Sequence, residues 1–594
     1  MPETKKKRVL VLGGGFAGMF AARELQRRVG QTAQIELINE VNYFVFQPLL
    51  PEVAAGGVSS RDAVAPLRRL LPGIRVRQAQ IFDIDLKRQV AVIFQGVQRR
   101  YTEVDYDHLV IALGQSIDLS RFPGLADHAL AMKTLSDALA LRNHVIDKLE
   151  HADITSLPEV KTELLTFTVI GGGFSGVETV GEMKDLIERS LVFYPNIDPR
   201  EVRVLLIEFA DRLLGELPAS LGAYAQQFLE KRGIEVLLKT GIREATGTAI
   251  VTTAGEVIGT RTVVATIGNA PSPLVSRLDL PSERGRIRTD RQLRVEGHEN
   301  VWALGDAALI PLVDAPAGRN DFAPPTAQFA VREARQLASN LAAALEGKAG
   351  SPFEYKSKGA LASLGGARGV AEVYGMRLSG LPAWLLWRGY YLSFVPGFAT
   401  KARVAMQWLL DWLAGRSTVQ TGTRDARATR YVRYRAGDRV FEEGNRADGF
   451  YSVLEGAFEL KIRGADGRET VRRIGPGGHF GERVLLGEGL RTGTVRALED
   501  SVVLFVGAED FQRLTRALPP LRDYFDRYVS DTFPASAIGS HEQAGTGLAA
   551  APGPVWPSRS TEGRTEEAGS PEWHVQEKTR ENTTASTRPG KSGD

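Results

Sequence analysis

A glycine-rich phrase occurs twice in this chain of 594 residues, as VLGGGFAGMF at 11–20 and again as VIGGGFSGVE at 169–178. In each copy a run of apolar residues leads into three glycines spaced G-x-G-x-x-G, and a helix-forming stretch follows. Such a loop lets the backbone approach the pyrophosphate of a dinucleotide, while the N–H groups of the helix N-terminus point at the phosphates. Two copies predict an α/β chain with two dinucleotide-binding domains.

The first copy has all the parts of such a domain. The continuous apolar strand at 8–12 leads into Gly13 for the tight turn, Gly15 for the close approach and Gly18 for helix–strand packing. The next strand, QIELIN, ends at Glu40, whose carboxylate we expect to accept the hydroxyls of an adenosine ribose. A glycine-rich turn in an unrelated α/β protein is the alternative interpretation.

The second copy repeats this Rossmann-type arrangement. Its glycines are Gly171, Gly173 and Gly176, and the following strand, VRVLLIE, ends at Glu208. A carboxylate there favours a nicotinamide cofactor with a free 2′-hydroxyl, because a 2′-phosphate would bring two anions together. Arg212 lies close by in the sequence and leaves the phosphorylated cofactor open.

Two dinucleotide sites in one chain predict hydride exchange between a tightly held flavin and a diffusible nicotinamide. The segment VWALGDAA at 301–308 favours FAD, because in flavoproteins with two dinucleotide sites the Asp of such a GD pair, here Asp306, contacts the ribityl chain. The alternative for Asp306 is an ordinary turn or a helix N-cap. The segment YDHLVIALG, which ends at Gly114, also fits that group of proteins.

Composition narrows the chemistry. The chain has no cysteine, which excludes a disulfide relay beside the flavin and a cysteine-bound iron–sulfur cluster. The eight histidines show no metal-ligand spacing, so no metal site is predicted, and a formal net charge of +3 does not indicate a nucleic-acid partner. The N-terminus runs directly into the first strand, which leaves no room for a signal peptide and predicts a cytoplasmic protein.

Aromatic residues concentrate at 381–413, where no apolar run reaches the roughly 18 residues that would span a bilayer. Arg388, Lys401, Arg403 and Asp411 interrupt the segment. We therefore expect a monotopic amphipathic membrane segment, with a buried helix pair or a homodimer interface as the alternatives. The apolar stripe of its last helix comprises Val404, Ala405, Trp408, Leu409, Trp412 and Leu413.

Residues 1 to about 415 resemble the type II NADH dehydrogenases, which are NADH:quinone oxidoreductases that do not pump protons. The motifs that carry the resemblance are GGGFAG, NYFVFQPLLPEVAAG at 42–56, KTLSDALALRNH at 133–144, GGGFSGVE followed by GEM, ALGDAA, PPTAQFAVREA at 324–334 and YKSKGALASLGG at 355–366. The resemblance implies hydride transfer from NADH to FAD, then delivery of electrons and protons to a membrane quinone from the cytoplasmic side of the cell membrane.

The resemblance also implies roles for individual residues. It makes Glu178 and Gln328 catalytic, the first beside the flavin and nicotinamide and the second, with Ala327, near the quinone. The family often continues with paired glutamines where this chain has Arg332–Glu333, which leaves the quinone and the proton route open. Other functions left open are a soluble NAD(P)H-dependent flavoprotein reductase of a small electron-carrier protein and a redox-sensing interaction protein.

A second resemblance begins after residue 428. Short β-like segments lead into GGHFGERVLLGEGLRTGTV at 477–495, which resembles the phosphate cassette of cyclic-nucleotide-binding domains. The resemblance implies that Gly481 and Glu482 meet the ribose, that Arg491 pairs with the cyclic phosphate, and that Thr492 leaves cAMP or cGMP open. Helical sequence at 509–530 would form a lid. The alternative is a degenerate β-roll kept for packing.

The sequence thus predicts two Rossmann-type domains for FAD and NAD, an amphipathic membrane segment, a small β-roll domain and a disordered tail. The predicted boundaries are 1–120 for the first part of the FAD-binding domain, 121–160 for a connection, 161–270 for the NAD-binding domain, 271–347 for the second part of the FAD-binding domain, 348–415 for the membrane-associating region, 416–428 for a linker, 429–531 for the cyclic-nucleotide-binding domain and 532–594 for the tail. The predicted cofactor-binding residues are Gly13, Gly15, Phe16, Ala17, Gly18, Glu40, Gly114, Asp306, Ala327, Gly171, Gly173, Gly176 and Glu208.

Overall fold

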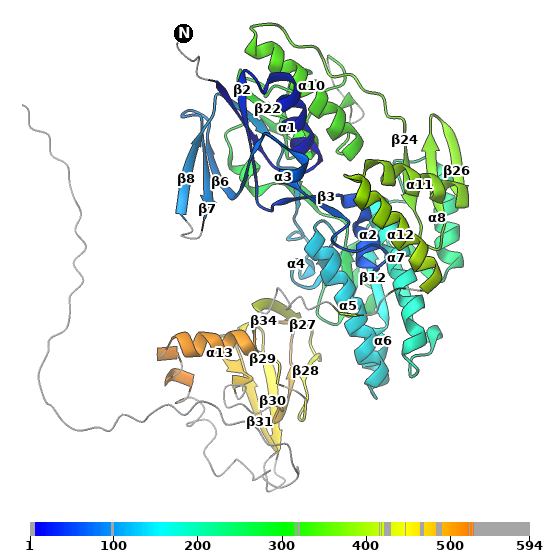
Figure 1. Cartoon of the computed structure of the whole chain (residues 1–594). Helices are drawn as coiled ribbons and strands as arrows, with labels where there is room; N and C mark the ends of the chain where they lie inside the picture. Colours follow the sequence, from blue (N-terminus) through cyan, green and yellow to red (C-terminus); the bar gives the residue numbers. More distant parts are fainter. Residues whose placement is uncertain are drawn as a thin grey trace, which may run out of the picture. The chain divides into compact units, whose positions relative to one another are not determined.

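The structure is a computed structural model that describes residues 6–96, 100–314, 318, 321–414, 416, 419–420, 429–445, 447–463, 469–482, 490–518, 520–521, 523–525 and 527 (Figure 1). The predicted tail at 532–594, most of the predicted linker at 416–428 and the last part of the predicted lid lie outside the described residues.

The first glycine phrase lies in a parallel sheet with the strand order β22-β9-β1-β2-β5. These strands are β22 (Val301–Ala303), β9 (His108–Ile111), β1 (Lys7–Leu12), β2 (Ala33–Asn39) and β5 (Arg75–Gln78). Helices α1 (Phe16–Val29) and α10 (Ala327–Leu345) pack side by side on this sheet (Figure 1). Since β22 and α10 come late in the sequence, the chain leaves this domain and returns to complete it.

The second glycine phrase lies in another parallel sheet, with the order β11-β18-β12-β13-β14. Its strands are β11 (Leu130–Ala131), β18 (Thr262–Ala265), β12 (Thr166–Ile170), β13 (Arg203–Ile207) and β14 (Ile234–Leu237), and its main helices are α7 (Phe174–Ser190) and α8 (Ala219–Lys231). Every residue of β12 is buried, as expected for a central parallel strand covered on both faces. The α/β architecture with two Rossmann-type domains is therefore confirmed.

Three antiparallel strands and two helices follow α10. They are β24 (Gly359–Ser363), β25 (Gly369–Val373), β26 (Met376–Gly380), α11 (Leu381–Phe394) and α12 (Phe398–Ala414). Helix α2 (Leu50–Ala54), from the NYFVFQPLLPEVAAG motif, packs against α5 (Leu135–Ile154) and α7, so it joins the two dinucleotide-binding domains. Within the parts of the chain that the structure describes, no helix combines the length and apolarity needed to cross a bilayer.

The structure divides the predicted apolar stripe of α12: Val404 and Trp408 are buried, whereas Ala405 and Leu409 are exposed, and membrane association stays a prediction. Val404 is fully buried and Trp408 is 9% exposed, so both side chains face the protein interior. The periodicity identified an amphipathic helix, but part of its apolar face packs onto the protein rather than outward. The exposed large apolar side chains of α11 and α12 are Leu381, Leu385, Phe394, Phe398, Met406, Leu409 and Leu410. The side chains of Trp412 and Leu413 lie outside the described residues.

The segment from residue 429 forms a β-roll of two four-stranded antiparallel sheets. One contains β27 (Thr429–Tyr434), β34 (Ser501–Gly507), β29 (Gly449–Glu455) and β32 (His479–Phe480), and the other contains β28 (Arg439–Phe441), β33 (Gly493–Ala497), β30 (Phe458–Arg463) and β31 (Glu469–Ile474). Helix α13 (Ala508–Ala517) follows, and its Phe511 ring stacks on Phe450 with ring centres 4.4 Å apart.

The remaining elements form smaller sheets, turns and connections. They are β3 (Tyr43–Val45), η1 (Gln47–Leu49), β4 (Val64–Pro66), α3 (Leu67–Leu70), β6 (Gln80–Asp85), β7 (Val90–Gln95), β8 (Arg100–Asp105), β10 (Gln115–Ile117), α4 (Leu125–His128), α6 (Pro158–Leu164), η2 (Leu191–Phe193), η3 (Pro199–Glu201), β15 (Ile242–Ala245), β16 (Ala249–Thr252), β17 (Val257–Gly259), β19 (Asn269–Pro271), α9 (Pro273–Arg277), β20 (Ser282–Glu283), β21 (Arg286–Arg288), η4 (Gly305–Ala307) and β23 (Ala308–Leu309).

Candidate functional site

Both glycine loops have the backbone geometry that their spacing predicts. Gly13 and Gly171 have φ of +102° and +111°, which side-chain-bearing residues rarely adopt. A Cβ added to Gly18 would lie 1.9 Å from the Gly13 carbonyl oxygen, and one added to Gly176 would lie 1.7 Å from that of Gly171. These four glycines are therefore required for the tight turn and for close packing of the helix on the strand.

The middle glycines, Gly15 and Gly173, differ from the other four. Each is the N-cap of its helix with φ of −75°, and no heavy atom of the described residues lies within 4 Å of a Cβ added at either position. Open space beside a helix N-terminus fits the close approach of a pyrophosphate in both domains. Phe16 and Ala17 form the first turn of α1 beside Gly15.

The residue that ends the second strand differs between the two domains. Gly13 N–H donates to Ile38 O at 2.9 Å, and Gly171 N–H donates to Ile207 O at 2.8 Å, so Asn39 and Glu208 hold equivalent positions. Asn39 Oδ1 accepts from Gly14 N–H at 2.7 Å. Glu208 accepts from the equivalent Gly172 N–H and, at 2.6 Å, from Ala210 N–H.

Glu40 lies one residue beyond Asn39, and its side chain is exposed. The sequence predicts Glu40 as the ribose ligand because it is the first carboxylate after the strand, but the backbone register places the amide of Asn39 against the glycine loop. A role for Glu40 at the ribose stays a prediction.

Asp306 follows Gly305 in η4, close to the first glycine loop. Burial raises the pKa of the Asp306 carboxyl, while Lys133 and Arg286 oppose that rise. A Cβ added to Gly305 would lie 2.6 Å from the Ala17 Cβ, so the turn packs directly on α1. The charged surroundings fit the polar ribityl chain of a flavin. Lys133 comes from the KTLSDALALRNH motif and was not identified from the sequence as a site residue.

Gln328 lies in the first turn of α10, next to Ala327, and its amide is fully oriented. Its Nε2 donates to Ser357 Oγ at 3.0 Å and to Gly359 O at 3.2 Å, and its Oε1 accepts from Tyr355 Oη at 3.1 Å. The chain around β24 therefore fixes the Gln328 side chain. Gly114, with φ of +63°, follows β9 and has no described atom within 4 Å of an added Cβ.

Arg332 and Glu333, where the resemblance leads one to expect paired glutamines, make different contacts. Arg332 donates to Gln328 O at 2.9 Å and lies 4.8 Å above the centre of the Tyr355 ring. Glu333 is 1% exposed, accepts from Gly305 N–H at 2.8 Å, and has its pKa raised to about 7 by burial. Glu333 therefore holds the turn that carries Asp306.

Glu178 is buried where α7 meets β24 and α11. Its Oε1 accepts from Ser363 N–H at 3.1 Å and from Trp387 Nε1 at 2.9 Å. Burial is the largest influence and raises the pKa of Glu178 to about 8, although both hydrogen bonds oppose it. Both of these hydrogen bonds are accepted by Oε1.

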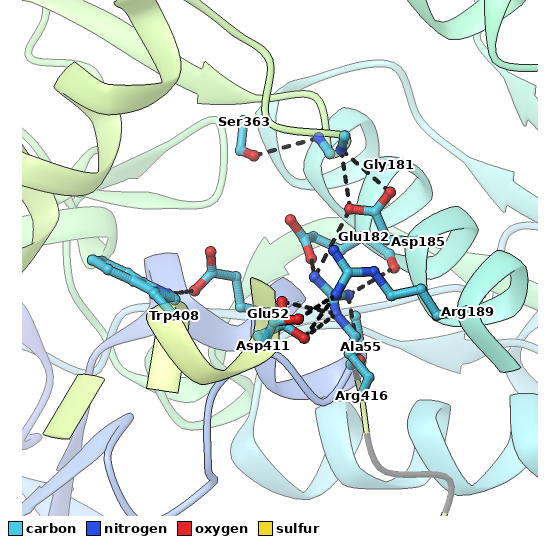
Figure 2. Close-up of polar contacts among 12 residues, drawn as sticks. Glu52, Ala55, Gly181, Glu182, Asp185, Arg189, Ser363, Trp408, Asp411 and Arg416 are labelled. Atoms are coloured by element: carbon cyan, nitrogen blue, oxygen red, sulfur yellow. Dashed lines mark hydrogen bonds and ion pairs between the residues drawn. The ribbon is translucent and has the colours of Figure 1, made fainter. Parts of the chain in front are cut away.

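A second buried carboxylate is Glu52 of α2, whose side chain points toward Trp408 of α12 (Figure 2). Its oxygens accept from Trp408 Nε1 at 2.6 Å and from Arg388 at 3.3 Å. The Arg388 guanidinium lies over the rings of Trp384 and Trp408, 4.1 and 4.4 Å from their centres. Glu52 was not identified from the sequence, although it lies within the quoted motif at 42–56.

The cyclic-nucleotide residues converge within the β-roll. Glu482 and Arg491 are 4% and 5% exposed, and a Cβ added to Gly481 would lie 2.7 Å from Arg491 Nη1. Arg491 pairs with Asp448 at 2.5 Å and lies 4.1 Å above the Phe441 ring centre. Thr492 is partly buried beside Arg491. Asp448 was not identified from the sequence, and a cyclic phosphate would compete with it for the guanidinium.

Comparison with known families defines the class of protein. Residues 7–334 match the pyridine nucleotide-disulphide oxidoreductase family, 357–417 match the NDH2 C-terminal domain, and 431–517 match the cyclic nucleotide-binding domain. The first match covers both glycine loops and more than half of the chain. The protein is thus a pyridine nucleotide-dependent oxidoreductase in fold, although it has no cysteine for the disulfide that the family name mentions.

Individual relatives define the family more closely. The chain is 32% identical over 429 residues to the type II NADH:quinone oxidoreductase Ndh of Mycobacterium tuberculosis, covering 69% of this chain and 89% of that protein. It is also 32% identical over 422 residues to the demethylphylloquinone reductase NdbB of Synechocystis, covering 69% of this chain and 98% of that protein. It therefore belongs to the type II NADH:quinone oxidoreductases.

A solved structure agrees in fold. The structure of NDH2 from Plasmodium falciparum in complex with NADH superposes with a TM-score of 0.65 at 20% identity, covering 70% of this chain and all of that one.

Proposed function

We propose that this protein transfers a hydride from NADH to a bound FAD and then reduces a membrane quinone, with the balance NADH + H⁺ + quinone → NAD⁺ + quinol. The observation that carries the proposal is the pair of open, helix-capping glycines in two separate sheets, within a chain of this family. When bound, the FAD would supply the two-electron chemistry between the nicotinamide and the quinone. The chain's residues would bind, orient and supply protons.

Glu178 is the proposed proton holder. A carboxyl with a pKa of about 8 is protonated at neutral pH and is matched to proton transfer at that pH. Its Oε2 would carry the proton toward the reduced quinone, while Ser363 and Trp387 hold Oε1. Gln328, fixed by Tyr355 and Ser357, would orient the acceptor through its amide.

Stopped-flow spectroscopy tests the reaction. NADH should bleach the flavin absorbance of the purified protein, and a water-soluble quinone analogue should restore it. Failure of the quinone to restore the absorbance, with restoration by a small electron-carrier protein, would establish the soluble reductase instead. Glu178→Gln should leave reduction by NADH intact and slow reoxidation by about 10²-fold, within the range for loss of a general acid.

Membrane association would use the exposed apolar side chains of α11 and α12. Leu385, Phe398, Leu409 and Leu410 are 57%, 87%, 49% and 52% exposed. Burying such side chains in the membrane interface contributes about 1.5–3 kcal/mol each. Leu409→Ser/Leu410→Ser should therefore reduce vesicle binding in co-sedimentation by at least about tenfold. A matched control is Phe82→Ser, which removes an apolar side chain 46% exposed on β6.

Cyclic nucleotide binding at Glu482 and Arg491 is proposed as a modulator of the oxidoreductase. The support is the buried Arg491, which Phe441 and Asp448 orient within the β-roll. Calorimetric titration with cAMP and with cGMP should detect one ligand, and Arg491→Ala should abolish binding. If a nucleotide binds while NADH:quinone kinetics stay unchanged, the modulation is rejected and binding alone is retained.

A further inference from the structure

Arg416 is a buried cation two residues after the end of α12, and in the sequence it precedes the β-roll that begins at residue 429. Its side chain is 3% exposed, and each guanidinium nitrogen has a partner (Figure 2). Nη2 donates to Glu182 Oε2 at 2.9 Å, Nη1 donates to Ala55 O at 3.3 Å, and Nε lies 3.3 Å from Asp411 Oδ1. Nothing in the proposed reaction uses this residue.

The surroundings are built to receive the guanidinium. A Cβ added to Gly57 would lie 3.3 Å from Arg416 Nη2, so the glycine leaves room for the group. The ionisable groups that face the cluster are Glu182 and Asp185 of α7, Glu52 of α2, Asp411 of α12, Arg388 of α11, and Arg189 and Arg232 at its edge.

Of the three carboxylates that contact Arg416, Glu182 depends most on it for a positive partner. Asp411 also pairs with Arg189 at 3.0 Å, and Asp185 also pairs with Arg232 at 2.6 Å, so each keeps a cation if Arg416 is removed. Among the ion pairs formed by the described residues, Glu182 takes part only in the one with Arg416. Burial raises the pKa of Glu182 to about 7, and Arg416 is the leading influence that lowers it.

Glu182 lies one helical turn from Glu178 on the same face of α7. The charge of Glu182, and more weakly that of Glu52, contributes to the raised pKa of Glu178. Tyr391 of α11 also faces Glu178, and its pKa is raised by burial and by that carboxyl. The charge state of Glu182 therefore reaches the proposed proton holder through space.

We propose that Arg416 is a positioning residue that favours the ionised form of Glu182, and that the charge of Glu182 in turn favours the proton on Glu178. This inference rests on the proposed role of Glu178 and deepens it. The junction between the oxidoreductase and the β-roll domain thus carries the cation that sets the proton affinity of the site.

Three variants of the full-length, FAD-loaded protein should rank the pKa of Glu178 in an order that a merely structural role of Arg416 would not produce. In Arg416→Gln, the protonated fraction of Glu182 at neutral pH should rise, and the loss of its nearby charge should lower the pKa of Glu178 despite the loss of a more distant cation. The double variant Arg416→Gln/Glu182→Gln should match the single one. Glu182→Gln alone keeps the cation and should lower the pKa of Glu178 most, because it removes a like charge without removing Arg416.

The readout is an infrared pH titration of the carbonyl stretch of the protonated carboxyl, assigned to Glu178 by its loss in Glu178→Gln. The control Arg189→Gln removes a partner of Asp411 at the surface and should leave the titration at its wild-type pH. The double variant removes both partners of the buried pair, so it avoids leaving a single buried charge and guards against misfolding.

Equal titration of Glu178 in the wild type and in all three variants overturns the inference, as does a shift to higher pH in Arg416→Gln. If the infrared ordering holds but the pH profile of flavin reoxidation is the same in all proteins, Arg416 does set the proton affinity and the proposed use of Glu178 as proton donor is rejected instead.

Discussion

The two glycine loops of this protein share a backbone and differ in the side chains around it. The three glycines of each loop play matching parts. Gly13 and Gly171 permit the tight turn, and Gly15 and Gly173 leave open space at the helix N-terminus. Gly18 and Gly176 let the helix pack closely on the strand. The acceptor for the loop N–H, however, is a neutral amide at Asn39 in the first domain and a carboxylate at Glu208 in the second.

The helices that follow the loops also differ. At the fifth position of α1 stands Phe20, packed against Phe16, whereas the fifth position of α7 is the buried Glu178. The backbone geometry of the two loops therefore suits any dinucleotide and does not by itself distinguish the two copies. The copies differ at the side chain that ends the strand and at the side chain one turn into the helix, and we propose that these two positions give each copy its own task.

The largest effect should come from filling the open glycine of each loop. Gly15→Val and Gly173→Val place a side chain in open space at a φ of −75° that valine accepts, so both variants should fold. Gly15→Val should weaken FAD binding at least about a hundredfold, or about 2.7 kcal/mol. Gly173→Val should keep its FAD and raise the concentration of NADH needed for flavin reduction by a similar factor.

Flavin content from absorbance and the NADH dependence of flavin bleaching measure the two effects separately. Gly18→Val is the contrasting control, because its Cβ would overlap the Gly13 carbonyl oxygen and should lower the yield of folded protein. Loss of FAD from Gly173→Val, with retention in Gly15→Val, would mean that the two cofactors are assigned to the wrong loops.

The fold could be predicted from the sequence because the strands, glycines and helices follow a spacing that the backbone itself requires. It could not place the strand-end residue reliably, because a parallel strand gives no sign of its last hydrogen bond. Glu40 was chosen for its charge, whereas register puts Asn39 on the loop. The buried pairs of Glu52 with Trp408 and of Glu182 with Arg416 join segments far apart in sequence, and no local pattern predicts such contacts.

The second-largest expected effect concerns Glu208, the carboxylate that ends the second strand of the second domain. Glu208→Gln should reduce the preference for NADH over NADPH by about ten- to a hundredfold. Two charges 4 Å apart interact by about 4 kcal/mol at an effective dielectric constant of 20, and solvent screening reduces that value. The measurement is the ratio of flavin bleaching rates with the two cofactors. An unchanged ratio in Glu208→Gln would show that another group, with Arg212 the first candidate, reads the ribose.

The third expected effect concerns the pH dependence of stability, which should depend on Glu178 of α7 but not on Phe20, its counterpart in α1. The pKa of Glu178 is raised from an ordinary 4.5 to about 8, so the folded protein holds a proton that the unfolded chain releases over that range. Its contribution to stability is full below about pH 4.5 and is lost as the pH rises through 8. The melting temperature of Glu178→Gln should therefore fall less than that of the wild type between pH 5 and about 8.5.

The slope should be reduced but not abolished, because Glu333 and Glu182 also have raised pKa values and remain in the variant. Thermal unfolding followed by circular dichroism at several pH values gives the comparison, and Phe20→Leu should run parallel to the wild type. Parallel slopes in Glu178→Gln and the wild type would contradict a protonated Glu178.

The smallest effect tests whether the amide of the first loop can be exchanged for the carboxylate of the second. Asn39 Oδ1 accepts from Gly14 N–H, while its Nδ2 donates to Val41 O at 2.8 Å. Asn39→Asp keeps the acceptor but turns the donor into an oxygen facing a carbonyl oxygen, which costs about 1–2 kcal/mol. The melting temperature should fall by about 2–4 °C per kcal/mol while the NADH preference stays unchanged, because the nicotinamide is assigned to the other loop. A change in that preference would mean that the two loops do not act separately.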